Sequence, residues 1–439
     1  MRRELPEQGR LFESTKNMAK SASKAIHLSV VATSRNDNHG GYLTLRMQHF
    51  VDGFVAQCRR HDLRAELILV EWNPPPHRRP LIEELKWPMD LGPCEIRIIT
   101  VPCEVHARLP HGDKLPLFQM IAKNVGIRRA HGRFVLATNI DILFSDEAIL
   151  FMRDKLQPGC LYRADRCDVP TEVPTEVPFD EVLDFCRRET FRIHATGFIL
   201  VKQPNGRWRP SSPWAAIRAV IWRGAIKSVW QIPLVIGRQL GLVDKPPAYT
   251  VSLTDEGTLR RVLRYLVGEL GSFYRFVRDR CRSVSKVAKW IYHALLKREL
   301  FTNACGDFTL LSKEDWESLR GYLEWPMYSL HLDSVIVHQA NRNGVKEVYL
   351  GKEACVYHIE HAPGSGFTPE SSDKLFARLD AQGIPYLDWE KDIEPMIRKM
   401  DLTRAAGSKV IYNEENWGYA GLDFQEASPA AVRMEAANP

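Results

Sequence analysis

Two polar residues at the end of an apolar run are the first indication of chemistry in this sequence. Residues 132–140 are typical of a buried strand, and the run ends at Asp141, two residues after Asn139. Because an unpaired buried carboxylate is costly, we expect Asp141 at the carboxyl end of the strand, where ligands collect in α/β sheets. On an extended chain this spacing points both side chains to one side, where the pair could meet a divalent metal that neutralises a diphosphate. The plainer interpretation is that Asp141 caps a helix that begins near Ser145.

A polar turn follows the first apolar segment, residues 26–33. Asn36 and Asp37 in this turn could meet a nucleobase or a phosphate through side chains and backbone amides. Gly40-Gly41 then opens a helix whose amino end favours anions. An Asx turn built from good turn formers explains the same residues without a ligand.

Two further side chains are candidates for binding a nucleotide. Glu71 comes directly after the expected strand 65–70, just as Asp141 comes directly after the expected strand 132–140. A carboxylate there could accept hydrogen bonds from a ribose or an imide nitrogen. Lys123 lies in the helix that precedes the Asp141 strand and could reach a phosphate, although helix lysines are usually solvated.

A second cluster of candidates lies far downstream. Gly306 and Asp307 lie in a polar loop before a helix that Ser312 is expected to cap. His331 and Asp333 open an amphipathic helix, and Asp333 could act as a general base that takes a proton from an acceptor hydroxyl. Its plainer role is again that of a helix cap.

An alternating segment, residues 355–361, carries His358 and His361 near its end. Either neutral imidazole could complete a metal site with Asp141. A single strand histidine is more often structural, but two within four residues, beside a glycine-rich loop, favour a ligand role.

The elements that must position these residues alternate along the chain. We expect strands at 26–33, 65–70, 95–101 and 132–140, and helices over about 43–60 and 116–131. This β-α-β-β-α-β pattern predicts an α/β fold with a mostly parallel sheet and helices on both faces.

The order of these motifs resembles that of bacterial glycosyltransferases of the GT-A fold. The motifs are the Asn-Asp turn, the Lys-Asn helix, Gly-Arg-Phe-Val-Leu-Ala-Thr-Asn-Ile-Asp, Gly-Asp-Phe, His-Leu-Asp and Tyr-His-Ile-Glu-His. The family-two-type and galactosyltransferase-type branches look most similar, over about residues 26–200 and 301–420. The resemblance implies a Rossmann-like nucleotide-sugar-binding sheet. It also implies metal-assisted transfer of a sugar, with Mn or Mg, to a hydroxyl of a glycan or lipid-linked acceptor.

Carried over by position, the resemblance implies that Asp37 and Glu71 bind the nucleoside. Asn139 and Asp141 would contact the metal and the diphosphate. Asn139 stands where the family has the first acid of an Asp-x-Asp pair, so this position brings no charge.

The same resemblance makes Asp333 the catalytic base and His358 a later metal ligand. Gly306 and Asp307 would lie at the acceptor or donor sugar. His331 stands with Asp333 where the family usually has an acidic pair.

Composition limits the class of protein. The chain has 439 residues, of which 44% are hydrophobic, enough for a large core. Its nine cysteines include no Cys-x-x-Cys pair, which favours reduced thiols in the cytoplasm over a zinc site or a disulfide framework. The sequence has no Gly-x-Gly-x-x-Gly for a dinucleotide cofactor and no recognisable nucleic-acid-binding motif.

The net charge of +6 hides a strong local asymmetry, because residues 207–298 hold 18 Lys/Arg and 5 Asp/Glu. From Arg275 the basic residues recur every three or four positions, on one face of an expected amphipathic helix. A helix covering the core with a solvated basic face would explain this pattern, as would a helix lying in a membrane surface. The second interpretation fits a lipid-linked acceptor and a cytoplasmic protein at the inner face of the membrane. The sequence contains no run of about 18 uncharged apolar residues, so we expect no membrane-spanning helix.

The chain divides into five expected parts. They are a loose arm (1–25), a nucleotide-sugar-binding half (26–200), a basic helical insertion (201–300), an acceptor and catalytic half (301–370), and a C-terminal helix and tail (371–439). Two other functions stay open: a non-catalytic membrane-surface binding protein on the same scaffold, and a nucleotidyltransferase.

Overall fold

A computed structural model describes residues 25–211, 300–361 and 372–431. The chain separates into two units. One contains residues 1–195, 199–209 and 301–439, and the other contains residues 196–198 and 210–300. Most of the expected arm and of the basic insertion, including the expected membrane-contacting helix, lies outside the described residues. In the described part of the chain, no helix is long and apolar enough to cross a membrane.

The fold is α/β, and the described residues form two mixed sheets in place of the mostly parallel sheet expected from the sequence. In this part of the chain the first sheet has eight strands, in the order β12-β6-β11-β4-β1-β2-β3-β14. These strands are β1 (Leu28–Ser34), β2 (Ala65–Trp72), β3 (Cys94–Val101), β4 (Phe134–Ala137), β6 (Cys160–Arg163), β11 (Thr309–Ser312), β12 (Lys346–Tyr349) and β14 (Gln425–Ala427). The second sheet has six strands within the described ranges, in the order β10-β9-β8-β7-β13-β5. They are β5 (Ile142–Phe144), β7 (Arg166–Val169), β8 (Arg192–Ala195), β9 (Phe198–Lys202), β10 (Trp208–Pro210) and β13 (Val356–Ile359).

The centre of the first sheet is parallel and contains a reversal of strand order. β1 pairs in parallel with both β2 and β4, and β2 pairs in parallel with β3. The chain thus builds outward from β1 to β3 and then returns to the other side of β1 with β4. In open α/β sheets, ligands bind outside the carboxyl ends of the strands at such a reversal. The loops that follow β1 and β4 are therefore the expected place for a site.

The described residues also form helices. They are α2 (Leu43–His61), α3 (Leu81–Glu84), α4 (Cys103–His106), α5 (Gln119–Arg129), α6 (Asp146–Asp154), α7 (Phe179–Glu189), α12 (Lys313–Leu319), α13 (Leu332–Arg342), α14 (Ser372–Gln382), η3 (Trp389–Ile393), α15 (Glu394–Ala405) and η4 (Trp417–Tyr419). Ser312 caps α12 as expected, because its hydroxyl accepts a hydrogen bond from the Asp315 amide.

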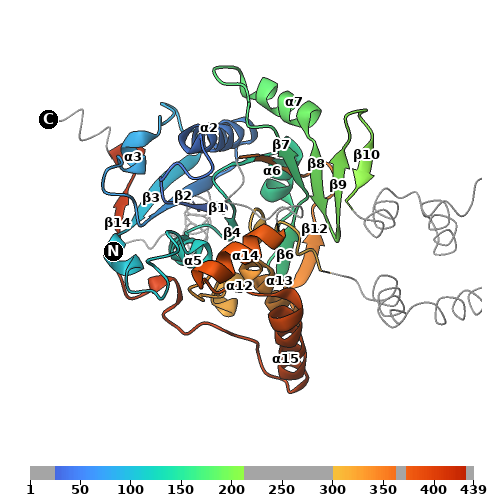
Figure 1. Ribbon diagram of the computed structural model, residues 1–439. Coiled ribbons are helices and arrows are strands. Elements are labelled where there is room, and N and C mark those ends of the chain that lie inside the picture. The colour runs from blue at the N-terminus through green and yellow to red at the C-terminus, as the bar shows by residue number, and fades with distance from the viewer. Residues whose placement is uncertain (1–24, 212–299, 362–371, 432–439) are drawn as a thin grey trace, which may run out of the picture. The chain divides into compact units, whose positions relative to one another are not determined.

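Helices α2 and α5 cover opposite faces of the first sheet (Figure 1). Neighbouring residues of a strand point to opposite faces. Val30 of β1 belongs to the core that Phe50 of α2 completes. Val31 faces Gly126 of α5, where an added Cβ would lie 2.5 Å from Val31 Cγ1. The absence of a side chain at Gly126 lets α5 approach β1 closely.

A separate core joins the second sheet to α7. It contains Val169 of β7, Tyr357 of β13 and Leu183 of α7, all buried. This packing fixes the two strands that carry the site histidine His358 and its partners.

Because α5 lies close to β1 at Gly126, a side chain added at this position should destabilise the fold. Gly126→Ala should lower the free energy of unfolding by about 1–3 kcal/mol, because overpacking outweighs the better helix propensity of alanine. Urea denaturation followed by circular dichroism measures this change. In a Val31→Ala background, Gly126→Ala should lower the free energy of unfolding by clearly less. An equal decrease in both backgrounds would contradict the contact between Gly126 and Val31.

Candidate functional site

Asp141 lies in a turn at the strand reversal, and not at the tip of an extended strand. β4 ends at Ala137, and residues 140–141 form a turn that leads into β5. The Asp141 carbonyl accepts a hydrogen bond from the Ile359 amide, which ties this turn to the end of β13. The helix-cap interpretation of Asp141 is wrong, because Ser145 caps α6 by accepting from the Ala148 amide.

Arg46 of α2 is the nearest charged partner of Asp141. Its Nη1 donates to Asp141 Oδ2 at 2.7 Å, and both side chains are almost fully buried. The same guanidinium donates to the carbonyls of His39 and Gly41 in the loop after β1. Arg46 therefore joins the loops that follow β1 and β4. Arg46 was not among the residues predicted from the sequence, although an arginine between Leu43 and Met47 on the apolar face of a helix is a usable signal.

The two predicted histidines converge on Asp141. His361 Nε2 lies 3.4 Å and His358 Nε2 lies 3.9 Å from Asp141 Oδ2. Gly40 permits this approach, since an added Cβ would lie 2.7 Å from His361 Nδ1. One potential ligand atom from each of Asp141, His358 and His361 lies within 4.8 Å of the others, so these residues, here called the Asp141 group, could hold a metal ion.

Two properties of Asp141 fit a cation. Its Oδ1 is buried and has no hydrogen-bond partner within the described residues. Burial alone would raise the pKa of Asp141, but the hydrogen bond from His361 and the charges of His358 and Arg46 hold that pKa below its ordinary value. The carboxylate therefore stays ionised, with one oxygen engaged by Arg46 and the other available for a ligand.

Asn139 has different partners from Asp141, contrary to the expectation that both face one ligand on an extended chain. Its side-chain oxygen accepts from Lys123 Nζ at 2.7 Å and from Gln119 at 2.8 Å. Its amide nitrogen donates to Asp307. Lys123 is fully buried and also donates to the Gly306 carbonyl at 2.7 Å. Burial lowers the pKa of Lys123 to about 8, against the opposing charges of Asp307 and Asp333.

Asp168 of β7 is a buried carboxylate that the sequence analysis missed. Its oxygens lie 2.8 Å from Arg166, 3.2 Å from Arg192, 3.1 Å from His194 and 3.2 Å from His358 Nδ1. Burial would raise the pKa of Asp168, but Arg166 and the two histidines hold it well below its ordinary value. Its sequence context is an ordinary alternating strand, in which only the pattern Arg-x-Asp gives a signal.

Arg166 connects Asp168 to the loop before β11. Its Nη1 donates to Asp307 Oδ2 at 2.7 Å. The other Asp307 oxygen accepts from Asn139, and the Asp307 carbonyl accepts from Thr138 at 2.7 Å. The predicted loop residues Gly306 and Asp307 are thus held against the turn after β4.

Asp333 joins the same loop from α13. Its Oδ2 accepts a hydrogen bond from the Gly306 amide at 2.7 Å, and the residue is half-buried. It is not the helix cap, because the capping position belongs to His331, which has a positive φ. The His331 ring lies 5.4 Å from the ring of Trp389, and burial lowers its pKa.

The predicted nucleoside-binding residues bind neighbouring protein segments. Asn36 Nδ2 donates to the Arg79 carbonyl at 2.8 Å, and Glu71 accepts from the Leu81 amide at 2.9 Å. Burial raises the pKa of Glu71. Asp37 is partly exposed and pairs with Arg35 at 3.2 Å. Of these three side chains, Asp37 is the most open to a ligand.

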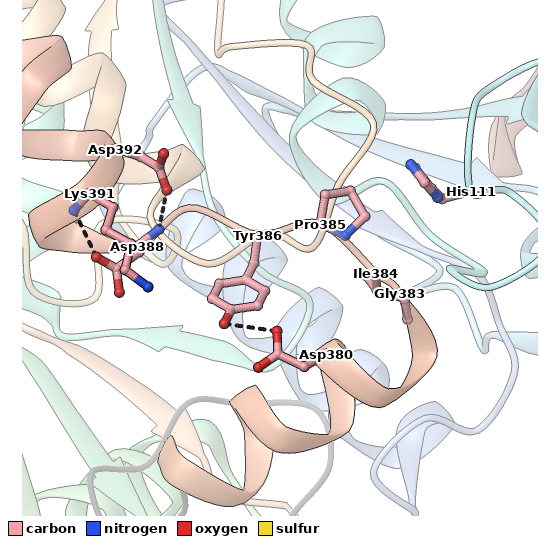
Figure 2. A pocket seen from close by; sticks show the side chains of 9 residues that line it. All are labelled: His111, Asp380, Gly383, Ile384, Pro385, Tyr386, Asp388, Lys391 and Asp392. Atoms are coloured by element: carbon pink, nitrogen blue, oxygen red, sulfur yellow. Dashed lines mark hydrogen bonds between the residues drawn. The ribbon is translucent and has the colours of Figure 1, made fainter.

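A pocket of about 460 Å³ opens beside η3 (Figure 2). It is lined by His111, Asp380, Gly383, Ile384, Pro385, Tyr386, Asp388, Lys391 and Asp392. Tyr386 donates to Asp380 at 3.1 Å, and the Asp388 amide donates to Asp392 at 2.8 Å. No residue of the Asp141 group lines this pocket. Beside this pocket, Trp389 of η3 contacts His331 of the predicted site.

Comparison with protein-family models and with curated proteins finds no match for this chain. The function of this protein is therefore inferred from the geometry of the site.

The lowered pKa of Lys123 predicts a pH-dependent stability difference. Between about pH 8 and the ordinary lysine pKa of 10.5, the unfolded chain holds a proton that the folded chain has lost. The free energy of unfolding of the wild type should therefore rise with pH, relative to that of Lys123→Met, across this interval. Urea unfolding of both proteins at pH 7 and pH 10 measures the effect. If the difference in the free energy of unfolding between the wild type and Lys123→Met is the same at both pH values, the pKa of Lys123 is not lowered.

Proposed function

We propose that this protein is a glycosyltransferase with a Rossmann-like sheet of the GT-A type. In this proposal it transfers a sugar from a nucleotide-sugar donor to a hydroxyl of a glycan or lipid-linked acceptor. The observation that carries the proposal is the Asp141 group, which combines an ionised carboxylate and two imidazoles at the reversal between β1 and β4. A nucleotide bound across such a reversal would bring its phosphates to the loops that follow these two strands.

The donor set is consistent with a divalent cation, for which the resemblance offered Mn²⁺ or Mg²⁺. Mg²⁺ prefers oxygen ligands, so a site with two imidazoles favours Mn²⁺ over Mg²⁺. When bound, the cation would neutralise the diphosphate leaving group. Asp141 and the two histidines would hold it, and Arg46 would keep Asp141 oriented through its other oxygen. Asp37 is the side chain we assign to the nucleoside.

Asp333 is the residue that we assign to the proton transfer. The residue is half-buried, and its Oδ2 accepts a hydrogen bond from the Gly306 amide. As the acceptor oxygen bonds to the anomeric carbon and the bond from that carbon to the diphosphate breaks, the hydroxyl proton would pass to Asp333. Lys123 holds the Gly306 carbonyl from the other side, so the loop that orients this base has a buried support.

Hydrolysis of a panel of nucleotide sugars with Mn²⁺ tests the proposal. Asp141→Asn should lower the release of nucleoside diphosphate by about 100-fold or more, because it removes the charge that holds the cation. Asp146→Asn is the matched control, since Asp146 pairs with Arg60 and His61 outside the Asp141 group. It should keep wild-type turnover.

The other outcomes separate the alternatives. Formation of a nucleotide sugar from a nucleoside triphosphate would identify a nucleotidyltransferase. Binding to liposomes without any binding of a nucleotide would favour the non-catalytic membrane-surface protein. Absence of both turnover and metal-dependent nucleotide binding in the wild type would refute the transferase.

Asp333→Asn tests the assignment of the base. Asparagine keeps an oxygen for the Gly306 amide but cannot take a proton, so turnover should fall by about 10²–10⁴-fold with donor affinity little changed. Steady-state kinetics and calorimetric titration with the nucleoside diphosphate measure the two quantities. Equal losses in affinity and turnover would mean that Asp333 only positions the loop.

A further inference from the structure

Asp168 faces the side of His358 that is turned away from Asp141. His358 Nδ1 lies 3.2 Å from Asp168 Oδ1, and His358 Nε2 lies 3.9 Å from Asp141 Oδ2. The imidazole is thus placed between two carboxylates, one at each ring nitrogen. A carboxylate this close to Nδ1 can fix the direction in which Nε2 is presented to a metal.

Strand register produces this arrangement. His358 of β13 is the direct partner of Asp168 of β7, and Asp168 is in turn the partner of Arg192 of β8. Side chains at paired positions lie on the same face of a sheet. His358, Asp168 and Arg192 therefore form a row across three strands, and the backbone pairing determines the position of the carboxylate.

Asp168 is suited to orient a ligand and not to act as one. Asp168, His358 and Glu360 also have ligand atoms close enough for a metal. However, Asp168 already contacts Arg166 and Arg192, and Arg192 also contacts Glu360 at 2.9 Å. Two guanidinium groups thus lie against Asp168, whereas Asp141 contacts one, that of Arg46, so the Asp141 side of His358 is the more favourable place for a cation.

We propose that Asp168 is a positioning residue that acts through His358 to set the affinity of the Asp141 group for a divalent cation. This inference rests on the metal site of the proposed function. It assigns a role to a residue that would not itself touch the metal or the donor. Through Arg166 and Asp307, the same carboxylate also connects His358 to Asn139 on the other side of the site.

Titration with Mn²⁺ alone, followed by the electron paramagnetic resonance signal of the free ion, tests the inference. Asp168→Asn should weaken Mn²⁺ binding by about 10–100-fold. In a His358→Ala background, Asp168→Asn should cause no further weakening, because its effect passes through His358. A purely structural role would give the same loss in both backgrounds.

Glu66→Gln is the matched control. Glu66 is a fully buried carboxylate that pairs with Arg97 at 2.9 Å and accepts from Ser29, outside the Asp141 group. Its loss should lower stability without changing Mn²⁺ affinity. Should Asp168→Asn fail to fold, Asp168→Asn combined with Arg192→Gln removes a carboxylate and a guanidinium together and should show the same weakening.

The outcomes are distinguishable. A wild-type protein that does not bind Mn²⁺ would refute the metal site of the proposed function and this inference with it. If the wild type binds Mn²⁺ and Asp168→Asn binds it equally tightly, the role of Asp168 is refuted, while the metal site of the proposed function stands.

Discussion

The pairing of buried charges constrains this site more than any other interaction. Among the described residues, an unbroken series of contacts runs through Arg46, Asp141, His358, Asp168, Arg166, Asp307, Asn139, Lys123, Gly306 and Asp333. We call this series the buried charge network. Removing one member of a buried pair leaves an uncompensated charge, at a cost of about 3–5 kcal/mol. Each contact therefore holds the loop or strand that carries it in one position.

The network explains how two separate sheets can form one site. Asp141 and Asn139 come from the turn after β4, whereas His358 and Asp168 belong to the second sheet. Arg46 adds α2 to the same group of elements. Charges in a low-dielectric interior interact strongly, and their attraction depends on distance. These pairs therefore hold the elements that carry them in fixed relative positions. Within the described residues, Asp141 Oδ1 is buried and has no hydrogen-bond partner, so this oxygen could bind a cation while Oδ2 stays paired with Arg46.

Particular residues show how far sequence reasoning reached. The grouping of Asp141 with His358 and His361 was predicted from residue types at strand ends, and the structure brings these three side chains together. The extended backbone predicted for residues 139–141 was wrong, because residues 140–141 form a turn, and Asn139 and Asp141 have different partners. Asp168 could not be predicted as a partner of His358, since their pairing depends on the register of β7 with β13, which no local pattern encodes.

The amino-acid sequence by itself determined the alternation of helices and strands, the apolar faces of α2 and α5, and the cap at Ser312. These features follow from periodicity and from local hydrogen bonding, so neighbouring residues suffice to predict them. Only the tertiary structure decided that there are two mixed sheets, that Arg46 reaches Asp141, and that Asp168 lies behind His358. The physical reason is that these contacts join residues distant in the chain, and burial of their charges is tolerable only in the one arrangement that pairs them.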